Sequence, residues 1–169
     1  MNQHTNNPKS NKQEEILFLL QDAMKQCKNL NHKSNYTFDL CDYKYTTQEA
    51  ILELGIDDEL IHQLVEDYVE QVIKTKQLFE EKIAILEKSK TNNGPLDFTP
   101  LRELAHKNLG VARNLRIKDG QSILEKMMKE ENLDCLRECL KILEICAIKL
   151  KPESAFNTIK LIKIKNSIF

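Results

Sequence analysis

The chain has 169 residues, which suffices for one domain with a modest core. Because 25 Lys and Arg residues nearly balance 26 Asp and Glu residues, charge gives no general argument for binding nucleic acid. Few glycines and prolines and the absence of tryptophan favour long helices over many short strands. No apolar run approaches the roughly 20 residues of a membrane span, and residues 16–20 are too short for a signal peptide, so we expect a cytoplasmic protein.

The five cysteines are an odd number and follow no export signal, which argues against a disulfide framework. Cys135, Cys139 and Cys146 recur on one helical face, where small, soft core residues are the ordinary interpretation. A thiolate metal site there would need further ligands that the sequence does not supply nearby. We therefore expect no bound metal.

The first 44 residues are predicted to form an extension. Residues 1–11 are polar and rich in asparagine, which favours disorder. Residues 12–28 carry an apolar stripe at helical spacing and are predicted to form an amphipathic helix. This arm either folds back onto the chain or pairs with a second copy in a weak dimer. Residues 36–45 are rich in aromatic residues and threonine, with some alternation, and are predicted to be extended or irregular.

A short helix is predicted over residues 47–54, with Thr46 or Thr47 as its cap and Gly55 as its stop. Asp57 then begins a long helix whose apolar residues keep the 3.6-residue period for about eight turns. Residues 91–95 have the composition of a loop.

Thr99 is predicted to cap the next helix, with Pro100 at its favoured first position. This helix should continue to about residue 117, and Asp119 and Gly120 should break the pattern. Two more helices are predicted over residues 122–130 and 132–151, and Pro152 marks the end of the last one.

Four amphipathic helices joined by short connections predict an all-α fold. The expected arrangement over residues 45–151 is an antiparallel four-helix bundle with the short helix leading it. Residues 152–169 are basic and apolar, and residues 162–165 alternate in a way that suits a strand paired with residues 36–40. A membrane-surface or partner-binding tail is the alternative. We favour docking onto the same protein, because the apolar residues need cover.

His106 is predicted to lie outside the hydrophobic core. At about 100° per residue, the apolar residues of the helix after Thr99 cluster on one side, and His106 points almost opposite to them. Gly110 follows one turn later on the same outer strip. Glycine inside a helix costs roughly 1 kcal/mol against alanine. An exposed imidazole beside a missing side chain suggests a place where another molecule approaches closely.

The segment from residue 104 to residue 117 resembles the active helix of the histidine phosphotransfer (HPt) domains of bacterial phosphorelays. His106 and Gly110 match the histidine and glycine of that motif, and residues 111–115 fit the small and apolar stretch after it. Two positions depart: Leu109 stands where the family has lysine, and Asn108 where it has an apolar residue. The resemblance covers roughly residues 45–150, judged by the order and length of the helices.

The resemblance implies a phosphocarrier that accepts a phosphoryl group on Nε2 of His106 and passes it to or from receiver aspartates of response regulators. A hybrid histidine kinase is a possible further donor. The Mg²⁺ ion and the acceptor aspartate would belong to the receiver, so no cofactor is expected on this chain. No phosphate-cradling glycine-rich loop is present, which fits a phosphotransfer protein without its own nucleotide site.

Transfer also needs positive charge for the phosphoryl oxygens. With Leu109 in place of the lysine, Lys107, Arg113 and Arg102 are the candidate cations. Each of them alone is more simply explained as part of a solvated face.

Leu109 is a candidate for an apolar docking surface around His106. Glu103 and Asn114 lie near enough in angle to belong to the same face. Asn108 turns toward the core and needs a hydrogen-bond partner there.

Two other functions stay open. A bundle that docks a receiver or a kinase without transferring phosphate is favoured by the two departures from the motif. An aspartyl-phosphate phosphatase would use Glu103 or Asn114 to orient water, which is the weaker reading. The sequence does not identify the cognate kinase, the regulator or the direction of phosphate flow.

Overall fold

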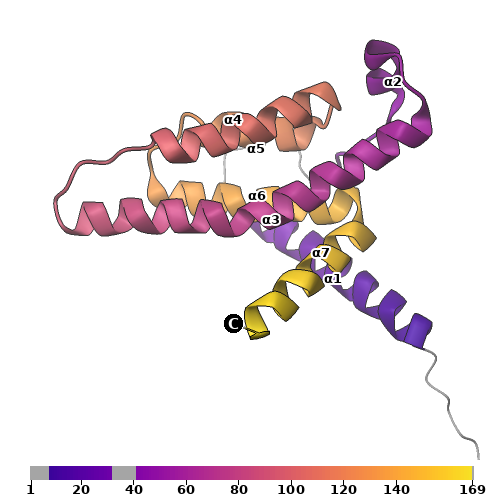
Figure 1. Cartoon of the computed structure of the whole chain (residues 1–169), viewed down its shortest axis with the longest axis horizontal. Coiled ribbons are helices and arrows are strands. Elements are labelled where there is room, and N and C mark those ends of the chain that lie inside the picture. Colours follow the sequence, from indigo (N-terminus) through magenta and orange to yellow (C-terminus); the bar gives the residue numbers. More distant parts are fainter. Residues whose placement is uncertain (1–7, 32–40, 169) are drawn as a thin grey trace, which may run out of the picture.

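A computed structural model describes residues 8–31 and 41–168. In these two ranges all regular secondary structure is α-helical, which confirms the predicted all-α class. The elements form layers, as Figure 1 shows. Helices α3 and α6 lie side by side in the middle, α4 and α5 cover one side of this pair, and α1 and α7 cover the other.

The middle layer consists of α3 (Asp58–Thr91) and α6 (Leu133–Leu150). Both helices begin at a capping side chain that satisfies an otherwise unpaired backbone N–H. The Asp57 carboxylate accepts from the Leu60 amide at 2.8 Å, and the Asn132 side chain accepts from the Cys135 amide at 3.0 Å. Both starts agree with the sequence prediction. Since other helices cover this pair on both sides, α6 is buried along most of its length.

The helix that carries His106 is α4 (Thr99–Asn114), and it packs against α3 and against α5 (Lys118–Met127). The predicted end of this helix near residue 117 is wrong. The chain leaves the helix after Asn114, and Arg116 adopts a left-handed conformation with φ of 57°. The predicted break at Asp119 and Gly120 is also wrong, because both residues lie in the first turn of α5.

Neither Thr47 nor Thr99 forms the predicted capping hydrogen bond through its side chain. Thr47 occupies the N-cap position of α2 (Gln48–Leu54), as predicted, but its hydroxyl donates to the Asp58 carboxylate and accepts no amide of the helix. At α4, Thr99 is already helical, and its amide donates to the Asp97 carboxylate at 3.0 Å. Pro100 lies in the first helical turn, as predicted.

The short helix α2 is fastened to the junction between α4 and α5 by ion pairs. Glu53 pairs with Arg116, and Glu49 pairs with Lys118 at 2.8 Å. Gly55 ends α2 in a left-handed conformation with φ of 65°, as the sequence predicts.

The two terminal helices form the layer opposite α4 and α5. Helix α1 (Pro8–Asn31) is longer than the predicted residues 12–28, and residues 8–11, for which disorder is predicted, are helical. It folds back onto α6 and α7, the first of the two alternatives for this arm. The predictions for residues 1–7 and 36–40 lie outside the described residues.

The C-terminal tail is a helix, α7 (Pro152–Ile168), so the strand prediction is wrong. Its predicted docking onto the same protein is confirmed, because α7 packs against α3, α6 and α1. Ala155 and Thr158 are buried in this contact. A helix satisfies its own backbone hydrogen bonds, so four alternating residues do not decide the structure of the segment.

Buried apolar side chains from each of the described helices form one continuous core, with α2 contributing Ala50. Its largest fully buried members include Phe79, Ile61, Ile83, Leu101, Leu124 and Met127. Among the described residues, none of the helices combines the length and the apolar character that a membrane span requires.

Candidate functional site

The structure places His106 on the solvent-exposed side of α4. The opposite side of this helix is in the core, where Leu101, Ala105 and Ala112 are almost completely buried. These positions recur at the spacing of one helix face, so burying them turns His106 outward. The predicted exposure of the imidazole is confirmed.

Gly110 lies one turn after His106 and is also exposed. A Cβ atom built at this position would meet no atom within 4 Å, apart from the backbone of its own helix. Packing within the chain therefore does not require glycine here. The missing side chain instead leaves the backbone accessible beside the imidazole.

Asn108 anchors this part of α4 from the inside. The side chain is completely buried, and its amide nitrogen donates to the Leu104 carbonyl at 2.9 Å. Its carbonyl oxygen accepts from the Gln71 side chain of α3 at 3.0 Å. Gln71 is the partner that the sequence could not name. A buried polar pair has few alternative arrangements, so it fixes the rotation of α4 relative to α3.

Leu109 cannot belong to a docking surface, because only 2% of it is exposed. This prediction is wrong. Helix α4 has neighbours on two sides, α3 and α5, so its buried face is wider than that of a helix with one neighbour. The apolar residue in place of the family's lysine is a core residue.

The three candidate cations differ in whether they form ion pairs with carboxylates. Arg113 pairs with Glu125 of α5 at 3.0 Å, and this guanidinium is the main reason why the pKa of Glu125 lies below its usual value. Arg102 pairs with Glu131 at 2.9 Å and lies over the Phe98 ring. Lys107 is exposed and has no carboxylate within salt-bridge distance in the described part of the chain. It is the candidate cation with the most freedom to meet a ligand.

Glu103 and Asn114 are exposed, as predicted. Asn114 also lines a hollow of about 500 Å³ formed by α2, α3 and α4. The hollow is mostly apolar, and its walls include Leu54, Ile56, Leu64, Val111 and Leu115. Sequence reasoning missed it because its walls come from three separate helices. It offers the apolar contact near α4 that Leu109 does not provide.

A second feature missed by sequence reasoning is a buried polar cluster at the α5–α6 contact. The Asp119 side chain accepts from the Gly120 amide at 2.7 Å and hydrogen-bonds Cys146. Burial is the largest influence on this carboxyl group and raises its pKa. Tyr68 of α3 is completely buried beside it, and burial raises its pKa well above the ordinary value. The only sequence signal was an aspartate and a glycine that look like a turn.

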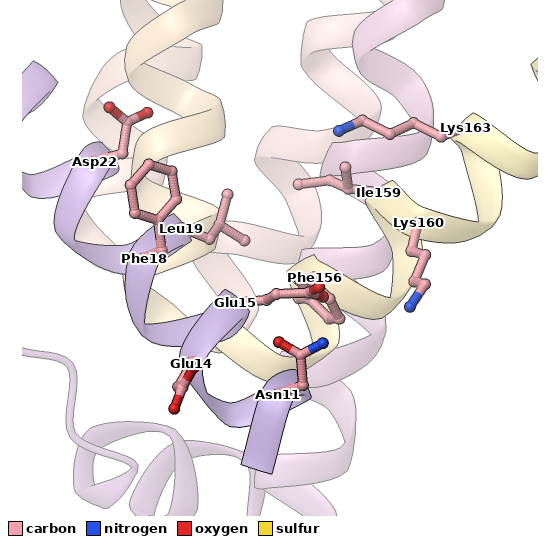
Figure 2. A pocket seen from close by; sticks show the side chains of 10 residues that line it. All are labelled: Asn11, Glu14, Glu15, Phe18, Leu19, Asp22, Phe156, Ile159, Lys160 and Lys163. Atoms are coloured by element: carbon pink, nitrogen blue, oxygen red, sulfur yellow. The ribbon is translucent and has the colours of Figure 1, made fainter. Parts of the chain in front are cut away.

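Another hollow lies in the layer of α1 and α7, on the opposite side of α3 and α6 from α4 and α5. It is a groove of about 700 Å³ between α1 and α7. Figure 2 shows Phe18 and Leu19 on the α1 wall and Phe156 and Ile159 on the α7 wall. Acidic side chains accompany the α1 wall, and Lys160 and Lys163 accompany α7.

We assign the other histidines of the chain no role in the site around His106. His62 is exposed on α3, where its ring lies 3.5 Å from Asp58 and 3.1 Å from Lys151. His4 and His32 are outside the described residues. Within the described residues, three or more His, Cys, Asp or Glu side chains do not come together in a group that could hold a metal ion.

Comparison of the chain with protein-family models, with curated proteins and with solved structures found no match. The assignment of a function therefore depends on the chemistry of these residues.

Proposed function

We propose that this protein is a phosphocarrier of the HPt type, which accepts a phosphoryl group on His106 from a receiver aspartate and donates it again. The observation that carries the proposal is the exposed imidazole with open space at Gly110, on a helix held in place by the buried Asn108–Gln71 pair. An exposed, rigidly mounted nucleophile that a protein partner can reach is what transfer between two proteins requires.

The chemistry needs few parts from this chain. The lone pair of the imidazole nitrogen attacks phosphorus, an N–P bond forms, and the P–O bond to the donor's aspartate breaks. The other ring nitrogen keeps its proton. Mg²⁺ and the aspartate would be supplied by the receiver domain.

Two further features support this proposal. The ring of contacts from α3 to α4, α5, α6 and back to α3 suits an HPt-like four-helix bundle that presents His106. The apolar hollow beside Asn114 lies about 8–12 Å along α4 from His106, from the rise of 1.5 Å per residue to Val111 and Asn114. A receiver that docks over His106 would have an apolar surface within reach.

Lys107 would supply most of the positive charge for the phosphoryl oxygens, because Arg102 and Arg113 already pair with carboxylates. We expect Lys107→Ala to slow transfer roughly two- to fivefold and Arg113→Ala to slow it less. Equal wild-type rates for both variants would remove this role.

The second candidate is a docking module that binds a receiver or a kinase without transfer. It is favoured by the burial of Leu109, which leaves Lys107 as the one candidate cation near His106 without an ion pair in the described residues. An aspartyl-phosphate phosphatase, with Glu103 or Asn114 orienting water, is the third candidate.

One experiment separates these functions. The full chain is incubated with a ³²P-labelled receiver domain, and the label is followed on both proteins. Acid-labile, base-stable label on this chain that is lost in His106→Ala supports the carrier. His62→Ala is the matched control, since it removes another exposed histidine and should keep the label. Free phosphate without label on this chain supports the phosphatase, and binding alone supports the docking module.

A further inference from the structure

Two cysteine thiols from opposite ends of the connection between α1 and α2 lie next to each other. The Cys41 thiol donates to the Cys27 sulfur across 3.0 Å. Cys27 belongs to the last part of α1, and Cys41 lies in the segment that leads to α2. A small side-chain movement brings such a pair to the bond length of about 2.05 Å.

The two thiols differ in their access to solvent. Cys41 is partly exposed and lines a hollow of about 370 Å³, whereas Cys27 is 3% exposed. A small oxidant in the hollow therefore meets Cys41 first. Cys27 lies behind it, where water and larger reagents are excluded but the Cys41 sulfur is within reach.

A third thiol, that of Cys146, lines the same hollow but is less available for oxidation. Cys146 is buried and hydrogen-bonded to Asp119, and burial raises its pKa well above the ordinary value of a thiol. Because the thiolate is the reactive form, this rise in pKa disfavours reaction at Cys146. The direct sulfur–sulfur contact and the access of Cys41 to solvent favour the Cys27–Cys41 pair.

We propose that Cys27 and Cys41 are a site of reversible oxidation, at which a peroxide converts the two thiols into a disulfide. In the first step the Cys41 sulfur attacks H₂O₂, the O–O bond breaks, and Cys41 becomes a sulfenic acid while water leaves. In the second step the Cys27 sulfur attacks the Cys41 sulfur, the S–S bond forms, and a second water leaves. The two thiols lose two electrons, and the peroxide gains them. A dithiol reductant reverses the reaction.

The disulfide would join α1 to a segment that is already tied to the end of α4. The Tyr45 hydroxyl donates to the Leu115 carbonyl at 2.7 Å. The Tyr43 hydroxyl accepts from the Lys118 amide at 3.1 Å and donates to the Arg116 carbonyl at 3.3 Å. Oxidation thus covalently links the α1 layer to the junction of α4 and α5. This inference does not depend on the function proposed for His106.

The test uses the reduced full chain, treated with a small excess of H₂O₂, quenched with catalase, and then unfolded and labelled with N-ethylmaleimide. Of the five cysteines, we expect three to take the label after oxidation, with an otherwise unchanged mass apart from the loss of two hydrogens. Peptide mapping should find Cys27 joined to Cys41, and prior treatment with dithiothreitol should restore all five labels.

Serine variants provide the controls. Neither Cys27→Ser nor Cys41→Ser should form the disulfide. Cys41→Ser should keep all its remaining cysteines available to the label, whereas Cys27→Ser should lose only the label on Cys41, because its sulfenic acid then has no thiol to attack it. Cys135→Ser, which changes a partly exposed cysteine of α6, should still lose two labels. Five labels in the oxidised wild type, a link that involves Cys146, or a stable sulfinic acid on Cys41 without a link would each overturn the proposal. Peptide mapping of the wild type decides the question even if a variant folds poorly.

Discussion

Replacing Gly110 with alanine is expected to stabilise the protein. Gly110 lies inside α4, and an added Cβ meets no atom within 4 Å outside its own helix. Alanine is favoured over glycine in a helix interior by about 0.8–1 kcal/mol, largely because it restricts the unfolded chain. For a chain of this size, that gain corresponds to a rise in Tm of about 2–4 °C.

Gly120→Ala is the matched control, since it makes the same chemical change in a helix with the opposite surroundings. An added Cβ at Gly120 would overlap the hydroxyl of Tyr68, which is 2% exposed and has little room to move. Overpacking of this kind costs about 1–3 kcal/mol. The two substitutions should therefore change the free energy of unfolding in opposite directions.

The assay is urea unfolding of both variants and the wild type, followed by circular dichroism. A loss of stability in Gly110→Ala would refute the reasoning, because it would mean that packing within the chain requires glycine there. A larger substitution extends the test to function. Gly110→Trp should fold with near wild-type stability yet lose phosphoryl transfer, because the indole would occupy the space beside His106.

Three further outcomes are expected. Burial raises the pKa of Asp119, so above the ordinary aspartate pKa the folded state holds more protons than the unfolded state, and stability falls as pH rises toward the folded pKa. Asp119→Asn should remove this fall in urea unfolding at a series of pH values, and an unchanged pH profile would contradict the burial of a titrating carboxyl group. Ending the chain at Lys151 should lower the free energy of unfolding by about 3 kcal/mol or more, because the partly buried Ile159 and Ile162 of α7 lose their contacts with the core. A chain ending at Ile164 loses only exposed residues of the described helix and should unfold like the wild type. Oxidation of Cys27 and Cys41 closes a loop of about 15 residues and should add about 3 kcal/mol, visible as a higher Tm without reductant that Cys41→Ser lacks.

The long helices could be predicted because their apolar residues repeat with one period over many turns. Residues of α3 such as Ile61, Val65 and Phe79 hold that period, and the structure buries all three. The outward direction of His106 follows from the same geometry. The starts of α3 and α6 could also be predicted from Asp57 and Asn132, because a capping side chain bonds to residues close by in the sequence.

Three of the errors share one physical cause, which is contact with a distant segment. The burial of Leu109 depends on α4 having two neighbouring helices, and one helical wheel cannot show how wide the buried face is. Gly120 looks like a helix breaker, yet glycine is needed there because Tyr68 of α3 occupies the space of a side chain. The C-terminal tail is helical although residues 162–165 alternate, because α7 packs against three helices.

The neighbouring thiols of Cys27 and Cys41 were beyond sequence reasoning for the same reason. Cys27 lies in α1 and Cys41 lies beyond the end of that helix, so no periodicity within one element relates them, and the fold brings them together. Contacts between elements far apart in the sequence are thus the features that the sequence pattern does not predict.

The most direct test of the proposed carrier identifies the side chain that receives the phosphoryl group. The full chain is mixed with phosphorylated receiver domains, and the phosphopeptides are mapped by mass spectrometry under conditions that preserve phosphohistidine. We expect the phosphoryl group on His106, and we expect it to return to a receiver when unphosphorylated receiver is added in excess. Phosphate on another side chain, or release of free phosphate while His106 stays unmodified, would contradict the proposed carrier function.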